Sequence, residues 1–167
     1  ETLPSERYHI ASNRRWLVLA LLAQQKTADA EPIVRQNILI LKKPTSLHPA
    51  QLLAAQSDLA HCLLERGKAA EAETYLQECF TKLAESLPAD HPAISATQAR
   101  LGNALRKQGK YESAAMHLAN ALPKLRDAYG DRYFETVAAY RHLLDVYEHN
   151  QQTKKLTALR KSFGDHE

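Results

Sequence analysis

The chain repeats itself every 42 residues, and this repeat constrains its fold more than any other feature. Apolar, turn and small residues coincide under the shift without a gap. The coinciding sets are Leu17, Leu59, Leu101 and Leu143; Gln25, Gly67, Gly109 and Gln151; Ala30, Ala72 and Ala114, followed by Leu156; and Val34, Leu76 and Leu118. Self-similar segments of this length predict an array of supersecondary units that stack side by side.

Each repeat predicts two helices joined by a short turn, because apolar residues recur at spacings of three and four. Gly67 and Gly109 suit a helix end in left-handed geometry, and Pro49 and Pro92 suit a first helical turn. The predicted first helices are 6–24, 49–66, 92–108 and 133–149. The predicted second helices are 28–42, 69–86, 112–129 and 153–163. We therefore predict an all-α domain over residues 1–167, with four helix–turn–helix repeats at about 6–43, 48–86, 91–129 and 133–163.

Small residues mark the predicted helix contacts. Ala114 and Ala121 lie where the second helix of a repeat should press on the first helices of its own and the following repeat. A larger side chain would force those helices apart. These alanines therefore predict architecture and carry no chemistry of their own.

Composition excludes several classes of protein. A net charge of +3 lacks the strongly basic character of a nucleic-acid-binding domain. The longest apolar run, Trp16–Ala23, is too short to span a bilayer, so no membrane contact is predicted. Two cysteines, Cys62 and Cys79, cannot build a disulfide framework and predict buried free thiols in a reducing, cytoplasmic setting. Because the first residue is Glu, we expect a fragment of a longer chain.

The third repeat resembles the tetratricopeptide repeat. Its matching residues are Leu101, Gly102, Gly109, Tyr111, Ala114, Leu118 and Ala121. The 42-residue length resembles the kinesin-light-chain type of this repeat, as do DHPA at Asp90–Ala93, LHPA at Leu47–Ala50 and DAEPIV at Asp29–Val34. The resemblance covers about residues 6 to 163 and is weaker in the first and last repeats, where Gln25 and Gln151 replace Gly.

The resemblance implies a right-handed superhelical solenoid whose concave groove, lined by first helices, binds a peptide. Carrying the groove positions over gives the candidate peptide-binding residues Arg15, His61, Arg100, Asn103, Arg106, Lys107, Arg141 and His142. Asn103 follows Leu101 and Gly102 at the position where the family's Asn bonds a ligand backbone. The basic side chains predict a carboxylate ligand, held by charge-assisted hydrogen bonds.

Other interpretations of these residues stay open at this stage. Arg100 and Arg106 are equally consistent with solvated charges, or with ion pairs to Asp58 or Glu65. Trp16 is either a binding anchor or, as we prefer, a cover for the apolar face of the first repeat.

His142, Asp145 and His149 share one helix face, but without a third strong ligand we predict no metal site. We predict no cofactor and no enzymatic activity, because no phosphate loop, nucleophile elbow or zinc-protease motif is present.

The sequence therefore predicts a non-enzymatic interaction module that binds a protein segment in its groove, and the basic groove residues favour an acidic segment. The alternative is a regulatory or scaffold domain of a larger signalling protein. Such a domain would pack on its own chain, or form a homo-oligomer through the apolar N-terminal face of Trp16, Leu17, Leu21 and Leu22.

Overall fold

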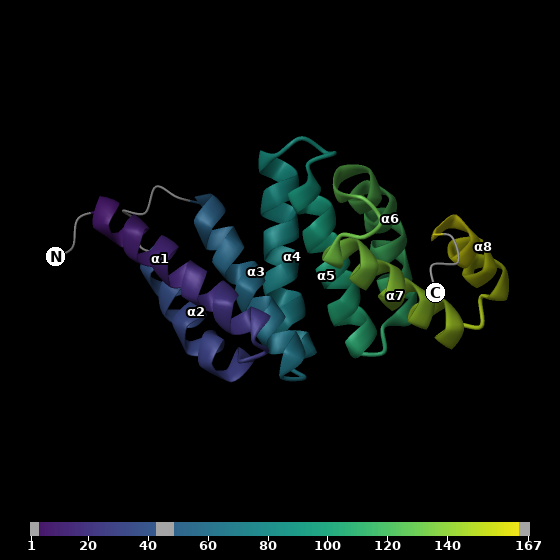
Figure 1. Cartoon of the computed structure of the whole chain (residues 1–167), viewed down its shortest axis with the longest axis horizontal. Coiled ribbons are helices and arrows are strands. Elements are labelled where there is room, and N and C mark those ends of the chain that lie inside the picture. The colour runs from purple at the N-terminus through teal and green to yellow at the C-terminus, as the bar shows by residue number, and fades with distance from the viewer. Residues whose placement is uncertain (1–3, 43–48, 164–167) are drawn as a thin grey trace. The chain divides into compact units, whose positions relative to one another are not determined.

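The computed structural model describes residues 4–42 and 49–163, which form eight α-helices and no strand within those ranges (Figure 1). The first helices of the repeats are α1 (Pro4–Ala23), α3 (Pro49–Glu65), α5 (Pro92–Lys107) and α7 (Phe134–His149). The second helices are α2 (Thr27–Leu41), α4 (Ala69–Ser86), α6 (Tyr111–Tyr129) and α8 (Thr153–Phe163). Each predicted boundary differs from the observed one by at most two residues. Part of the predicted LHPA motif, residues 47 and 48, lies outside the described residues.

All four turns between paired helices have the same left-handed geometry. The φ angles are 59° at Gln25, 74° at Gly67, 75° at Gly109 and 53° at Gln151. The next residue of each turn donates its N–H to the carbonyl five residues earlier, as in a Schellman motif. These bonds are Lys26 to Leu21 at 2.9 Å, Lys68 to Leu63 at 2.8 Å, Lys110 to Leu105 at 3.0 Å and Gln152 to Tyr147 at 2.9 Å. The outer repeats therefore keep the turn of the inner ones although they lack its glycine.

The small residues pack as predicted. Ala72, Ala114 and Ala121 are fully buried. At Gly102, α5 and α6 approach so closely that a Cβ added there would lie 2.6 Å from Leu118 Cγ. The prediction that small residues serve close helix packing is confirmed at these positions.

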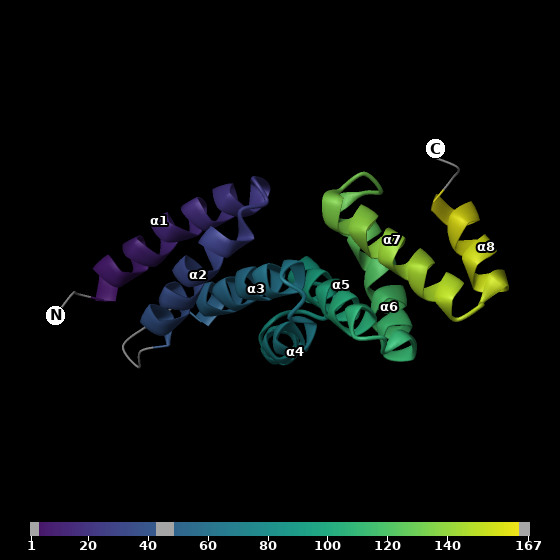
Figure 2. The ribbon, with the colours of Figure 1, turned by 90° about the horizontal axis from the view of Figure 1, so that it is seen from below.

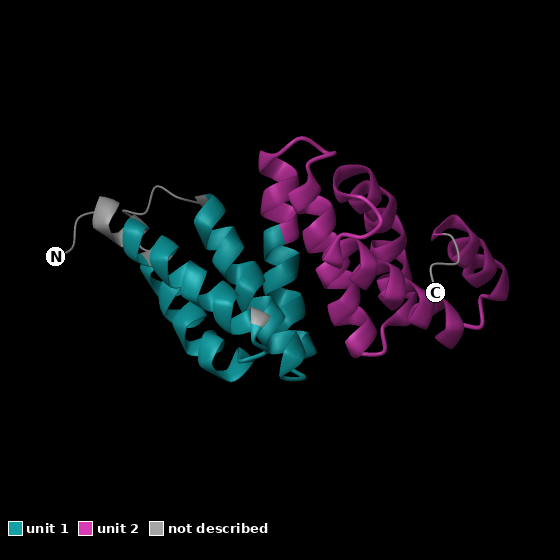
Figure 3. Ribbon diagram, in the orientation of Figure 1, with its two compact units in different colours: residues 1–79 teal, residues 80–167 magenta. Residues whose placement is uncertain are grey.

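The chain divides into two compact units, residues 1–79 (unit 1) and 80–167 (unit 2), with the boundary inside α4 (Figure 3). In unit 1, α3 packs on both α1 and α2, and in unit 2, α7 packs on both α5 and α6 while α8 packs on α7 (Figure 2). Leu59 and Leu63 belong to the core of unit 1, and Leu118 and Leu125 to that of unit 2. The prediction of one domain over residues 1–167 stays a prediction.

An ion-pair network that the sequence did not predict joins α2 to the α3–α4 turn in unit 1. The buried Glu31 carboxylate accepts hydrogen bonds from Arg35 at 2.9 and 3.0 Å and also pairs with Arg66. Arg35 also donates to Glu71 at 2.7 Å. Burial acts to raise the pKa of Glu31, but the hydrogen bonds from Arg35 and Arg66 outweigh it and lower the pKa. The Glu of the DAEPIV run is therefore a structural residue.

Candidate functional site: the first-helix faces of the two units

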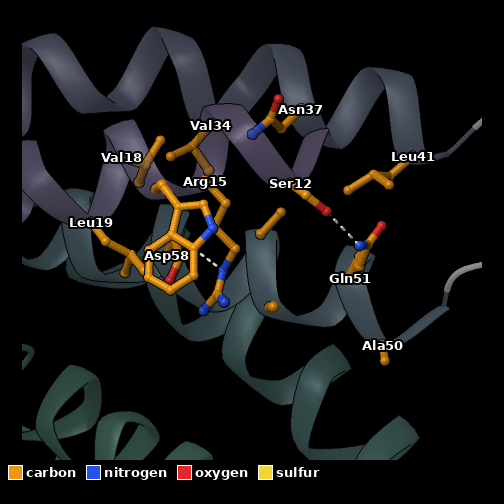
Figure 4. Close-up of a pocket in the computed structure, with 13 residues that line it drawn as sticks. Ser12, Arg15, Val18, Leu19, Val34, Asn37, Leu41, Ala50, Gln51 and Asp58 are labelled. Atoms are coloured by element: carbon orange, nitrogen blue, oxygen red, sulfur yellow. Dashed lines mark hydrogen bonds and ion pairs between the residues drawn. The ribbon is translucent and has the colours of Figure 1, made fainter. Parts of the chain in front are cut away.

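In unit 1, the first helices α1 and α3 enclose a pocket of about 320 Å³ together with α2 (Figure 4). We call it the α1–α3 pocket. Its apolar wall includes Val18, Leu19, Val34, Leu41 and Ala54. Val18 and Leu19 come from α1, Val34 and Leu41 from α2, and Ala54 from α3. The pocket lies among residues that the groove prediction selected, including Arg15.

Two pairs of polar side chains in the α1–α3 pocket are hydrogen-bonded to each other. Arg15 Nε donates to Asp58 Oδ2 at 3.0 Å, and Gln51 Nε2 donates to Ser12 Oγ at 3.0 Å (Figure 4). The Asp58 side chain is only 9% exposed. Arg15, predicted to be a ligand-binding cation, therefore forms an ion pair with a largely buried carboxylate of the chain itself.

Trp16 lines the α1–α3 pocket and is 74% exposed. This position favours the anchor interpretation over the preferred one, in which Trp16 covers the apolar N-terminal face. Leu17 is the large apolar side chain that α1 exposes beside it. His61 lies exposed on α3, one turn beyond Asp58.

In unit 2, α5 and α7 form a polar surface, the α5–α7 surface, made of Asn103, Arg106, Lys107 and His142, and the exposed Arg141 precedes His142 on α7. Arg106 connects the two helices: its Nε and Nη2 donate to Asn103 Oδ1 at 3.2 and 3.0 Å, and its Nη1 pairs with Asp145. Asn103, predicted to bond a ligand backbone, thus accepts from a neighbour through its carbonyl. Its amide NH₂ is the group that a ligand carbonyl could use.

Arg100 is less available than predicted. It pairs with Glu135 at the start of α7, whose side chain is 11% exposed. The open alternative of ion pairing is therefore observed for Arg100 and Arg106, but with Glu135 and Asp145 in place of Asp58 and Glu65. Arg141 is exposed and has no carboxylate partner within the described part of the chain.

Burial and nearby charges both affect the ionisation of His142. Burial lowers its pKa to about 4, assisted by the positive charges of Arg106 and Lys107 and opposed by Asp145. His142 is therefore neutral at pH 7, and the field around it is positive.

The suggested metal half-site is not assembled. Asp145 pairs with Arg106, and the ring of His149 stacks on Tyr111 at a centroid distance of 3.7 Å. Across residues 4–42 and 49–163, no three His, Cys, Asp or Glu side chains come together as metal ligands. Cys62 and Cys79 are buried and form no disulfide, and burial raises the pKa of Cys62 to about 11.

The structure thus groups the predicted residues by unit. Arg15 lies in the α1–α3 pocket, and Asn103, Arg106, Lys107 and His142 lie together on the α5–α7 surface. The carboxylates that neutralise the predicted cations, Asp58, Glu135 and Asp145, lie on the following first helix in each case. In the sequence, each of these ion pairs corresponds to an acidic residue that follows its arginine by 35 to 43 positions. None of the helices in the described ranges combines the length and apolar character needed to cross a membrane.

Comparison with known proteins agrees with this architecture. Residues 51–127 match the family model of the tetratricopeptide repeat. No curated protein sequence matches the chain. The fold is similar to the crystal structure of a Podosopora anserina putative kinesin light chain with nearly identical TPR-like repeats, at a TM-score of 0.80 and 20% identity over 98% of this chain and 75% of that one. It is also similar to BtubC (BKLC) from P. vanneervenii, at a TM-score of 0.71 and 17% identity over 96% of this chain and 70% of that one. The predicted all-α helical-repeat solenoid is confirmed.

Proposed function

Because residues 51–127 match the tetratricopeptide-repeat family model and the fold is similar to that of kinesin-light-chain repeat structures, we propose that the chain is a non-enzymatic interaction module that binds a segment of a partner protein. The segment lies on the first-helix faces, where each unit offers a recognition surface. The observation that carries this proposal is the pairing pattern in unit 2. Asn103 and Asp145 hold the Arg106 guanidinium in place, while Arg141 has no carboxylate partner within the described residues.

We infer that the segment is acidic where it meets the α5–α7 surface. Arg106 pairs with Asp145, whereas Arg141 has no carboxylate partner among the described residues. A carboxylate would gain charge-assisted hydrogen bonds from Arg141, each contributing roughly 1.5–3 kcal/mol when well formed. Neutral His142 and the Asn103 NH₂ add donors that do not depend on the ligand's charge.

The test is a titration with a peptide that the chain selects from a display library of natural protein segments. We expect Arg141→Glu to weaken binding about tenfold or more, and binding to weaken with added salt because exposed charges are screened over about 8 Å at physiological ionic strength. Lys154→Glu is the matched control, since it makes the same charge change on an exposed position of the second helix α8. Equal effects of the two variants would mean that only net charge matters, and would remove the α5–α7 surface from the proposal.

Arg100→Glu is unsuitable for this test. It would place a second carboxylate beside Glu135, which is largely buried, and so would change the fold as well as the ligand.

The second candidate function is self-association or packing on the parent chain. It is favoured by the exposure of Leu17 and Leu39 in unit 1. Sedimentation at increasing protein concentration tests it. A dimer that dissociates in the Leu17→Glu variant would support this candidate, and a monomer at every concentration would exclude self-association. The cytoplasmic location suggested by the cysteines, which form no disulfide, stays a prediction.

A further inference from the structure

We propose that the α1–α3 pocket binds an uncharged apolar side chain of the partner segment. Unit 1 would then select its partner by an apolar anchor, and acidity would matter only at the α5–α7 surface. This inference rests on the proposed function, because it assumes that a protein segment lies on the first-helix faces.

The shape of the α1–α3 pocket suits one large side chain. Its volume of about 320 Å³ is at the lower end of the roughly 300–1,000 Å³ of known ligand pockets. Val18 and Val34 are buried at its base, while Ala50 and Ala54 give α3 a small-residue wall. A site this size leaves no room for a folded element, but it accepts a side chain that projects from an extended segment.

The charges of the pocket argue against a charged occupant. Arg15 and Asp58 satisfy each other at 3.0 Å, and the Asp58 side chain is 9% exposed. Only Nε of Arg15 contacts Asp58, so an acidic ligand side chain that approached the rest of the guanidinium would also be repelled by the Asp58 carboxylate. A basic side chain that approached Asp58 would be repelled by Arg15 in the same way. Because the two charges offset each other, the pocket gives a charged side chain little net attraction and is better matched to an uncharged group.

Trp16 supplies the contact that would hold such an occupant. Its ring lines the pocket and is 74% exposed, so an apolar side chain in the pocket would remove part of that ring from water. Aromatic anchors of this kind carry much of the binding energy at protein interfaces. Trp16 is also the only tryptophan of the chain, which makes its fluorescence a specific reporter on this pocket.

The experiment uses a phage-displayed random-peptide library that lacks tryptophan, selected on the whole chain. Synthetic copies of the enriched peptides are then titrated while Trp16 emission is recorded. We expect the peptides to share an uncharged apolar residue, to shift Trp16 emission to shorter wavelength, and to lose affinity about tenfold or more when that residue is changed to Glu.

Ala54→Leu, which fills the pocket, should lower the affinity by a similar factor. Ala70→Leu is the matched control, because it makes the same change on an exposed face of α4. Trp16→Ala, measured by calorimetry, gives a second test that does not depend on packing, since this side chain is mostly exposed.

Three results would overturn the inference. If peptides bind without an apolar residue, do not change Trp16 emission and keep their affinity for Ala54→Leu, the pocket is excluded while the proposed function stays in place. Trp16 emission that shifts with protein concentration alone would show that a second copy of the chain fills the pocket. Absence of any bound peptide would reject the proposed function and this inference with it.

Discussion

Substitution of Gly102 by alanine tests how closely α5 and α6 approach. The new methyl would lie 2.6 Å from Leu118 Cγ, 3.1 Å from Leu118 Cδ2 and 3.3 Å from the Ala114 carbonyl oxygen. Leu118 is fully buried, so it has little room to move aside. Overpacking of this kind costs about 1–3 kcal/mol, whereas alanine gains about 0.5–1 kcal/mol over glycine inside a helix. We therefore expect Gly102→Ala to lower the free energy of unfolding by about 0.5–2 kcal/mol.

The assay is urea denaturation followed by circular dichroism, arranged as a double-mutant cycle with Leu118→Ala. Leu118→Ala alone should cost about 2–5 kcal/mol because it leaves a cavity. In that background the methyl at position 102 has space, so Gly102→Ala should become neutral or slightly stabilising, which gives a coupling energy of about 1 kcal/mol or more. If Gly102→Ala stabilises the otherwise unchanged chain, the two helices are not as close as the structure places them and the reasoning fails.

Three further predictions concern packing, charge and pH. Ala72→Leu should lower the free energy of unfolding by about 1–3 kcal/mol, whereas Ala50→Leu, at an exposed position, should change it by less than about 0.5 kcal/mol; similar denaturation midpoints for both would contradict the packing of α4. Arg100→Glu should destabilise the chain by about 1–3 kcal/mol because Glu135 is largely buried, and Arg100→Gln by less; an unchanged midpoint for Arg100→Glu would show that the ion pair with Glu135 does not form in solution. The pKa of His142 is lowered to about 4 in the folded chain, so between about pH 6.5 and 4 the unfolded chain binds more protons than the folded chain. The free energy of unfolding should therefore fall as the pH is lowered through this range. The urea midpoint of His142→Asn should lack this part of the pH dependence.

The repeat made the helices and their turns predictable. Because Gln25 and Gln151 align with Gly67 and Gly109, the register placed all four turns; the left-handed geometry was predicted only at the two glycines, and the structure shows it at both glutamines as well. The buried alanines followed in the same way, since a small residue at one point of the repeat has the same neighbours in the next.

The site was predicted less well, because its properties depend on side-chain pairing across helices. The groove positions identified Arg100 and Arg106, but not that Glu135 and Asp145 would neutralise them, since those acids are far away in the sequence and reach the cations only through the packing of α5 and α7. The orientation of Trp16 depends on its place on α1 relative to α3, which hydrophobic periodicity does not determine.

Hydrogen–deuterium exchange of the whole chain, with and without a selected peptide, tests the central claim most directly. If a protein segment binds the first-helix faces, the peptide should slow amide exchange in α1, α3, α5 and α7, with smaller changes in α2, α4, α6 and α8. Protection confined to the second helices, despite saturating peptide, would contradict the account.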